Sequence, residues 1–118
     1  QTQQVTLDEQ AVELEYQVHT PVEQPVFGIG IFRGDGVQCY GSNTHIERLE
    51  VARLAQDGNV RCEIERLDLV EGSYYLDVAV HAEDGRAYDY QKRVCPFAVR
   101  SPIKDIGVYR PPHRWVIN

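Results

Sequence analysis

The clearest strand in this sequence is Ser73-Tyr74-Tyr75-Leu76-Asp77-Val78-Ala79-Val80-His81-Ala82. Its side chains alternate with a period of two. One face carries Tyr74, Leu76, Val78 and Val80, and the other carries Tyr75, Asp77, Ala79 and His81. Because successive side chains of a strand point to opposite faces, this pattern predicts a strand with one face in a hydrophobic core and the other face wet.

Two hairpins extend outward from this strand. After it, Glu83-Asp84-Gly85 predicts a turn, and residues 88–99 predict a return strand that Pro96 marks as an edge or a bulge. Before it, the strand Val26–Arg33 alternates as well, with Gly28, Gly30 and Phe32 away from the core. Gly34-Asp35-Gly36 then predicts a turn into a third short strand over residues 37–40.

The remaining segments add strands rather than helices. Residues 12–19 and 60–64 alternate between apolar and polar side chains, which is typical of half-buried strands. Residues 41–58 are irregular, and we expect a long loop there with a short helix or an edge strand. Many short strands separated by Gly and Asp turns favour an all-β antiparallel sandwich over residues 1–102, followed by an extension over residues 103–118.

Composition limits the classes of partner. A chain of 118 residues is the size of one domain, and its net charge of -6 argues against nucleic-acid binding, which needs a basic face. The three cysteines form no disulfide framework and no C-x-x-C pair, and the four histidines are widely spaced, so we expect no metal and no cofactor. The same cysteine usage favours a reducing compartment, the cytoplasm. Because the sequence contains no methionine and no signal peptide, we interpret it as part of a longer protein.

Catalytic signatures are missing from the sequence. It contains no G-x-x-x-x-G-K-[ST] loop, no G-x-S-x-G elbow and no H-E-x-x-H motif, so we expect a domain that is not an enzyme. One alternative stays open: Asp77 and Asp89 fall on neighbouring predicted strands and could pair for glycosidic cleavage.

Polar and aromatic side chains gather around the central hairpin. Because aromatic rings stack on sugar C–H faces while Asp, His, Arg and Tyr bond to hydroxyl groups, this set predicts a glycan-binding surface. The two strand glycines would make that surface a shallow groove, unless they mark a bulge and the tyrosines only cover the core edge. The candidate glycan-binding residues are Phe32, Arg33, Tyr75, Asp77, His81, Tyr88, Asp89, Tyr90 and Trp115.

The extension over residues 103–118 is too apolar and aromatic for a solvated tail. Such a segment needs a packing partner, and adding a strand to a neighbouring sheet is one route to a dimer. The candidate dimerisation residues are Ile106, Val108, Tyr109, Trp115 and Val116.

Most of the chain resembles one family. The resembling segments are residues 21–37 (PVEQPVFGIGIFRGDGV), 41–44 (GSNT), 69–81 (LVEGSYYLDVAVH), 88–90 (YDY), 97–99 (FAV) and 107–115 (GVYRPPHRW). Together, in this order, they are similar to the C-terminal domains of Wzt-type ATP-binding subunits of O-antigen polysaccharide ABC transporters.

The resemblance implies an immunoglobulin-like β-sandwich that follows an ATP-binding domain. It implies a peripheral position on the cytoplasmic side of the inner membrane of a Gram-negative cell, with the transporter membrane subunit as a partner of the full-length protein. It also implies recognition of lipid-linked O-antigen polysaccharide and a homodimer, in some members through an exchanged C-terminal strand. The competing hypothesis is a dimerisation and coupling domain without a glycan site of its own.

Overall fold

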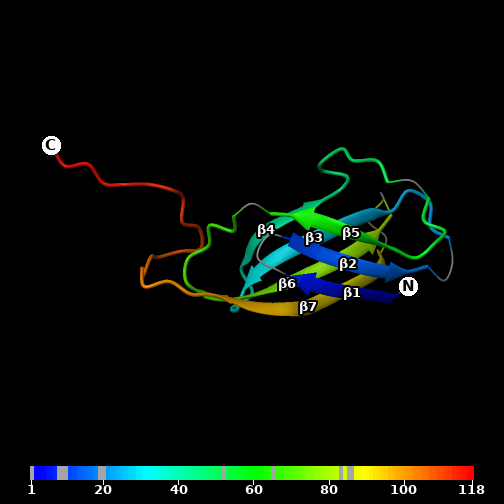
Figure 1. Ribbon diagram of the computed structural model, residues 1–118, viewed down its shortest axis with the longest axis horizontal. Helices are drawn as coiled ribbons and strands as arrows, with labels where there is room; N and C mark the ends of the chain where they lie inside the picture. The colour runs from blue at the N-terminus through cyan, green and yellow to red at the C-terminus, as the bar shows by residue number, and fades with distance from the viewer. Residues whose placement is uncertain are drawn as a thin grey trace.

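A computed structural model describes residues 2–7, 11–18, 21–51, 53–64, 66–82, 84 and 87–118, with the backbone alone at residues 2–7, 11–14 and 87. In this part of the chain, seven strands form two antiparallel sheets (Figure 1). The strands are β1 (Thr2–Leu7), β2 (Ala11–Gln17), β3 (Val26–Arg33), β4 (Gln38–Asn43), β5 (Gly58–Glu63), β6 (Gly72–His81) and β7 (Ala87–Val99). One sheet has the order β1-β2-β5 and the other β4-β3-β6-β7. None of the described segments is a helix long and apolar enough to cross a membrane.

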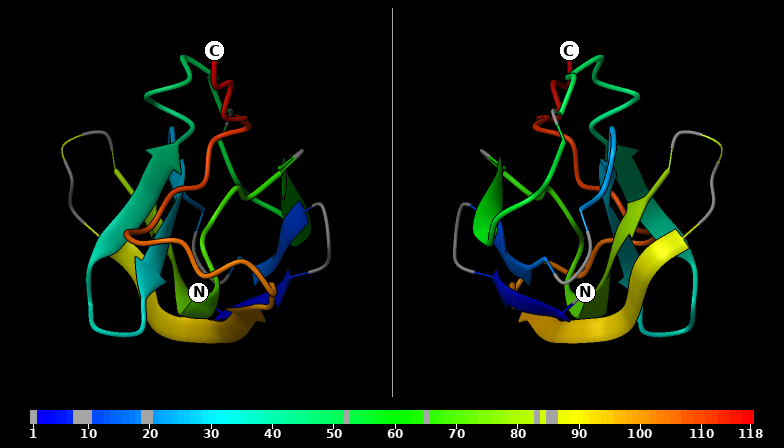
Figure 2. Two further views of the ribbon diagram at one scale, coloured as in Figure 1. Left: turned by 90° about the vertical axis from the view of Figure 1, so that its left-hand side faces the viewer. Right: turned by 90° about the vertical axis from the view of Figure 1, so that its right-hand side faces the viewer.

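The strand order is that of an immunoglobulin-like sandwich, as expected. The chain changes sheets after β2, after β4 and after β5, and the two sheets face each other in the end views of Figure 2. The Tyr74 hydroxyl donates a 2.6 Å hydrogen bond to the carbonyl of Val70, four residues upstream. This contact at the start of β6 is the tyrosine corner of immunoglobulin-like domains. It fixes the loop that brings the chain from one sheet to the other.

The core lies between the two sheets and is centred on β3 and β6. Phe27, Ile31, Leu76, Val78 and Val80 form its buried cluster, and each is at most 4% exposed. Cross-strand neighbours in the register bring these side chains together: Ile31 lies opposite Leu76, and Phe27 opposite Val80. The inward face predicted for residues 73–82 is therefore confirmed.

The middle of the opposite face of β6 is buried, contrary to the expectation, while Tyr75 and His81 on the same face are partly exposed. Asp77 is 7% exposed and Ala79 is 9% exposed, because β6 is a central strand covered by side chains of β3 and β7. In β7, three residues, Lys92 to Val94, lie where one residue would oppose Asp77. This bulge stands at Arg93, whose φ is 53°, and not at Pro96, which lies opposite Tyr75 on the outer strand of the sheet.

Three segments differ from the sequence prediction or extend it. Strand β1 was not predicted, because the run of Gln and Thr at its start carries no apolar alternation. Strand β4 continues to Asn43 instead of ending at Tyr40. Within the described part of residues 44–57, turns and a bridge between Val22 and Leu54 take the place of the suggested helix. The prediction for His19 and for the turn residues Glu83 and Gly85 lies outside the described residues.

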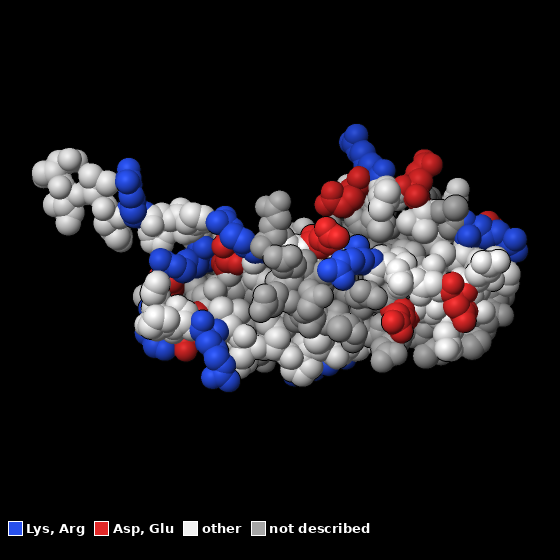
Figure 3. All heavy atoms as spheres, viewed as in Figure 1, with Lys and Arg blue, Asp and Glu red and all other residues white. Residues whose placement is uncertain are grey.

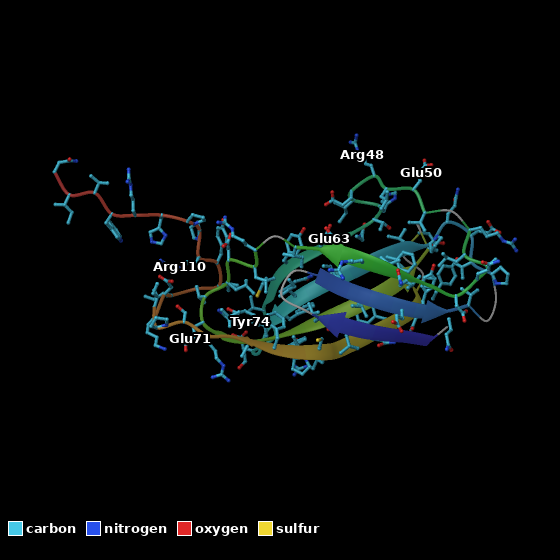
Figure 4. The ribbon with its side chains drawn as sticks, in the orientation of Figure 1. Arg48, Glu50, Glu63, Glu71, Tyr74 and Arg110 are labelled. Atoms are coloured by element: carbon cyan, nitrogen blue, oxygen red, sulfur yellow. The ribbon has the colours of Figure 1, made fainter. Side chains whose placement is uncertain are left out.

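The extension leaves the sandwich at the end opposite the N-terminus (Figure 1). A β-bridge between Tyr109 and Leu69 anchors its middle. Beside this bridge, the Val70 amide donates a 2.8 Å hydrogen bond to the Val108 carbonyl. Ion pairs join Lys104 to Glu71, and Arg110 to Asp105. Basic and acidic side chains therefore lie close together at this end of the molecule (Figures 3 and 4). Beyond Arg110, residues 111–118 are all exposed.

Candidate functional site

A groove of about 460 Å³ runs over the outer face of the four-stranded sheet. Its floor consists of small residues: Gly28 and Gly30 on β3, Gly41 on β4 and Ala79 on β6. Its walls are larger side chains from both sides, namely Phe32, Gln38, Ser42, Asn43, Ile46, Asp77, His81 and Tyr90. The groove that was predicted from the two glycines of β3 is present. Pairing of β3 with β4 adds a third glycine, Gly41, to its floor.

The floor is open at one position and covered at two others. A Cβ atom added at Gly28 would meet Asn43 Cβ at 3.5 Å, an ordinary contact, so this position has free space above it. A Cβ atom at Gly41 would lie 2.7 Å from Gln38 Nε2, and one at Gly30 would lie 2.9 Å from Phe32 Cε1. The Gln38 and Phe32 side chains therefore fold over the glycines and close one end of the groove.

Asp77 organises the wall on the side of β6 and β7. Its Oδ2 accepts a 2.8 Å hydrogen bond from the Tyr90 hydroxyl, and its Oδ1 accepts one of 3.0 Å from the Arg93 amide. The amide bond ties the β7 bulge to β6, so both carboxylate oxygens are engaged. Hydrogen bonding to Asp77, followed by partial burial, raises the pKa of Tyr90 above its ordinary value.

Phe32, Tyr75 and Arg93 form a stack beside the groove. The rings of Phe32 and Tyr75 are nearly parallel, with centroids 5.4 Å apart, and the Arg93 guanidinium lies 4.3 Å from the Tyr75 centroid. Because β3 and β7 flank β6 on opposite sides, both faces of the Tyr75 ring are covered. Tyr75 thus supports Phe32 and offers no open face of its own, while Phe32 and the half-exposed Tyr90 line the groove.

His81 lies at the far end of the same wall. Its Nδ1 is 2.7 Å from the carbonyl oxygen of Ala82. A carbonyl only accepts, so Nδ1 carries the proton, and in the neutral ring Nε2 is the acceptor.

Two candidate residues face the other way. Asp89 lies opposite Val80, which points into the core, and Tyr88 packs against the core cluster. Asp89 alternates with the outward-facing Tyr90, and the shift in pairing between Val80 and His81 leaves Tyr88 as the extra residue on the inward side. Asp77 and Asp89 thus lie on opposite faces of the sheet, which removes the basis for a carboxylate pair acting on one glycosidic bond.

Two further candidates lie at the extension end of the sandwich. Arg33 binds Asp35 of the following turn through two hydrogen bonds of 2.9 and 2.8 Å. This contact raises the pKa of Arg33 and lowers the pKa of Asp35. Trp115 lies in the extension and is 88% exposed. Neither residue lines the groove.

The contribution of β4 and its following turn to the groove was not predicted from the sequence. Gln38, Gly41, Ser42, Asn43 and Ile46 line the groove from that side. The signal that could have found them is the hairpin itself: once Gly30 is placed on the outer face, its antiparallel partner Gly41 falls on the same face.

A second hollow, of about 680 Å³, is lined by residues of β3, β4 and β5 and so lies between the two sheets. Its lining is mainly apolar, including Ile29, Val60, Cys62, Leu67 and Leu69. Val108 and Tyr109 of the extension also line it, so the extension borders this hollow and not the outer groove.

Comparisons with known proteins find similarity in sequence and, separately, in fold. The family model of the Wzt C-terminal domain matches residues 2–111. The O-antigen export system ATP-binding protein RfbB of Myxococcus xanthus is 32% identical over 107 residues, which cover 91% of this chain and 24% of that protein. This chain therefore spans about a quarter of the length of that relative.

A solved structure supports the architecture. The crystal structure of the C-terminal domain of wzt superimposes with a TM-score of 0.72 over 92% of this chain and 68% of that one, at 19% identity. At this identity the likeness establishes the sandwich fold. The family match over residues 2–111 shows that this chain belongs to the Wzt C-terminal domain family.

Proposed function

We propose that this domain recognises O-antigen polysaccharide, without catalysis, as the substrate-specificity domain of an ABC exporter. The observation that carries the proposal is the groove on the outer face of the four-stranded sheet, with a floor of glycines and with Phe32 and Tyr90 on its walls. A thin floor lets a sugar ring approach the backbone, aromatic edges contact its C–H groups, and the amides of Gln38 and Asn43 can bond to hydroxyl groups. The name of the Myxococcus xanthus relative points to the same transport system.

In this proposal the domain acts on the cytoplasmic side of the inner membrane of a Gram-negative cell and binds the lipid-linked polymer there. The relative is named an ATP-binding protein, whereas the present sequence has no P-loop. We therefore assign ATP binding, and contact with the transporter membrane subunit, to regions of the longer protein that this chain does not span.

The direct test is calorimetric titration of the domain with the O-polysaccharide of its own source organism and with an unrelated one. Calorimetry suits the site because Trp115 lies outside the groove and its fluorescence would not report on it. We expect saturable binding of the cognate polymer alone. Absence of binding to both polymers would contradict the proposal.

Gly28→Val locates the site. The Cβ atom fits, and the two methyl groups project into the groove, so we expect a normal fold and binding at least about tenfold weaker. The matched control is Ala98→Val, which enlarges an exposed residue of β7 that does not line the groove. Equal affinity of the two variants would place the glycan elsewhere.

A second proposed role, dimerisation, has its own observation. Ile106, Trp115, Val116 and Ile117 are between 65% and 98% exposed, an apolar set that no described contact covers. The division into a sandwich over residues 1–102 and an extension over residues 103–118 is part of this proposal. We expect deletion of residues 111–118 to convert a dimer into a monomer in light scattering, with the fold unchanged. An unchanged mass would count against the exchange of this segment.

A further inference from the structure

The groove walls differ in the hydrogen-bonding groups that they offer. On the side of β3 and β4, Asn43 Oδ1 accepts a 2.7 Å bond from the Ile46 amide, so the NH₂ group is the part of Asn43 that can donate to a ligand. Gln38 adds a second amide over the glycine floor. This wall can donate.

The side of β6 and β7 offers acceptors. The Tyr90 proton is held by Asp77, which leaves the oxygen lone pairs of Tyr90 for a ligand. His81, bound through Nδ1 to the Ala82 carbonyl, presents Nε2 as an acceptor in its neutral form. No Lys or Arg is among the described residues that line the groove.

These contacts decide which ligand groups fit. A sugar hydroxyl both donates and accepts, so it can bond to either wall. A carboxylate or a phosphate only accepts, and at the β6–β7 wall it would face the Tyr90 lone pairs and the buried Asp77 charge. A carboxylate or a phosphate that finds no donor at this wall would carry the full desolvation penalty of an unpaired polar group.

We propose that Asp77 is a positioning residue of the groove: by holding the Tyr90 proton, it makes Tyr90 an acceptor and selects an uncharged segment of the glycan that presents a hydroxyl donor at this wall. The inference rests on the proposed function, because it requires a glycan in the groove. It adds a ligand class, uncharged sugar units, and a residue that sets the class without touching the ligand.

The first experiment measures affinity for the O-polysaccharide of the source organism in four proteins: wild type, Asp77→Asn, Tyr90→Phe and the double variant. We expect each single variant to bind about tenfold more weakly. Tyr90→Phe removes the hydroxyl group that accepts from the ligand, and Asp77→Asn no longer holds the Tyr90 proton away from the ligand. The double variant should bind no more weakly than Tyr90→Phe, since both changes act through the same hydroxyl group.

Tyr40→Phe is the matched control. Tyr40 is 51% exposed and Tyr90 is 50% exposed, but Tyr40 borders the other hollow, so its variant should bind normally. Unchanged affinity in Asp77→Asn, or additive losses in the double variant, would overturn the inference while leaving the proposed function intact. Absence of binding by wild type would overturn both.

A ligand-free readout separates positioning from folding. A pH titration followed by carbon NMR of the ring carbon that bears the Tyr90 hydroxyl gives the pKa of Tyr90. This raised pKa should fall toward its ordinary value in Asp77→Asn. An unchanged titration would show that Asp77 does not hold this proton in solution.

The second experiment keeps the protein unchanged and varies the charge of the ligand. Hydroxyethyl and carboxymethyl derivatives of the same polysaccharide, at equal substitution, have similar size and differ in charge. At 1 M NaCl, long-range repulsion from the net charge of -6 is screened within about 3 Å. We expect the neutral derivative to bind at least about tenfold more tightly. Equal binding of the two would overturn the inference, even if Asp77→Asn failed to fold.

Discussion

The outer groove and the C-terminal extension are the two regions of this molecule where surface chemistry is unusual, and they are built in opposite ways. In the groove, every wall residue except Ile46 stands on a strand of the hydrogen-bonded four-stranded sheet, and the buried Asp77 is 7% exposed. In the extension, a single bridge and a few exposed ion pairs hold residues 104–110, and Trp115 beyond them is 88% exposed. The groove is thus already shaped for the proposed ligand, whereas the extension would gain its contacts only in the proposed dimer.

The largest expected difference between the two regions is in stability. Leu76 is 1% exposed at the centre of the sheet that carries the groove, so Leu76→Ala should lower the free energy of unfolding by about 3 kcal/mol. Ile106 in the extension is 98% exposed, and Ile106→Ala should change it by less than about 0.5 kcal/mol. Urea denaturation of both variants measures the contrast. Similar losses would mean that the extension is part of the cooperative core.

A smaller effect tests the junction between the two regions. The buried Tyr74 hydroxyl bonds to the Val70 carbonyl, and the Val70 amide bonds to the Val108 carbonyl of the extension. Tyr74→Phe should cost about 1.5 kcal/mol, because it leaves that carbonyl short of a partner in a buried site. It should also raise hydrogen exchange at the Val70 amide. Fast exchange already present in the wild type would show that the extension is not anchored there.

The smallest expected effect is a pH dependence of the groove wall. The pKa of Tyr90 is raised, so the folded state keeps this proton at a pH where the unfolded chain has lost it. The corresponding stability is fully present below about pH 10, the ordinary value for tyrosine, and is lost as the pH rises through the folded value. In urea titrations between pH 9 and pH 11, Tyr90→Phe should lose less stability than wild type. Parallel curves would argue against the bond to Asp77.

Local alternation was enough to predict much of the fold. It predicted β3 to the residue, the inward face of β6 and the glycine-lined outer surface, since period-two patterns report directly on which face is buried. The bulge at Arg93 could not be predicted in this way. At the bulge the Arg93 amide donates a hydrogen bond to Asp77, 16 residues away in sequence, and no local pattern encodes such a contact.

The same limit applies to the candidate site. Phe32, Asp77, His81 and Tyr90 line the groove because they stand on strands whose faces could be predicted. Asp89 faces inward because it alternates with Tyr90, and Tyr88 faces inward because the pairing shift between Val80 and His81 leaves it as the extra residue of a bulge, which no local pattern predicts. Asn43 was missed because its place in the wall depends on how far β4 pairs with β3.

Pro96 on β7 has a consequence for how this domain behaves at high concentration. It has no N–H group, and with the nearby bulge at Arg93 it interrupts the row of donors along the outer edge of that strand. The opposite edge of the sheet, β4, carries no proline and no positive φ angle, and its register shift lies near its start, between Gln38 and Tyr40. Of the two edges of this sheet, β4 is therefore the one where fibril growth from misassembled protein should start, and a lysine introduced at Tyr40 should improve solubility more than a lysine introduced at Ala98 on β7.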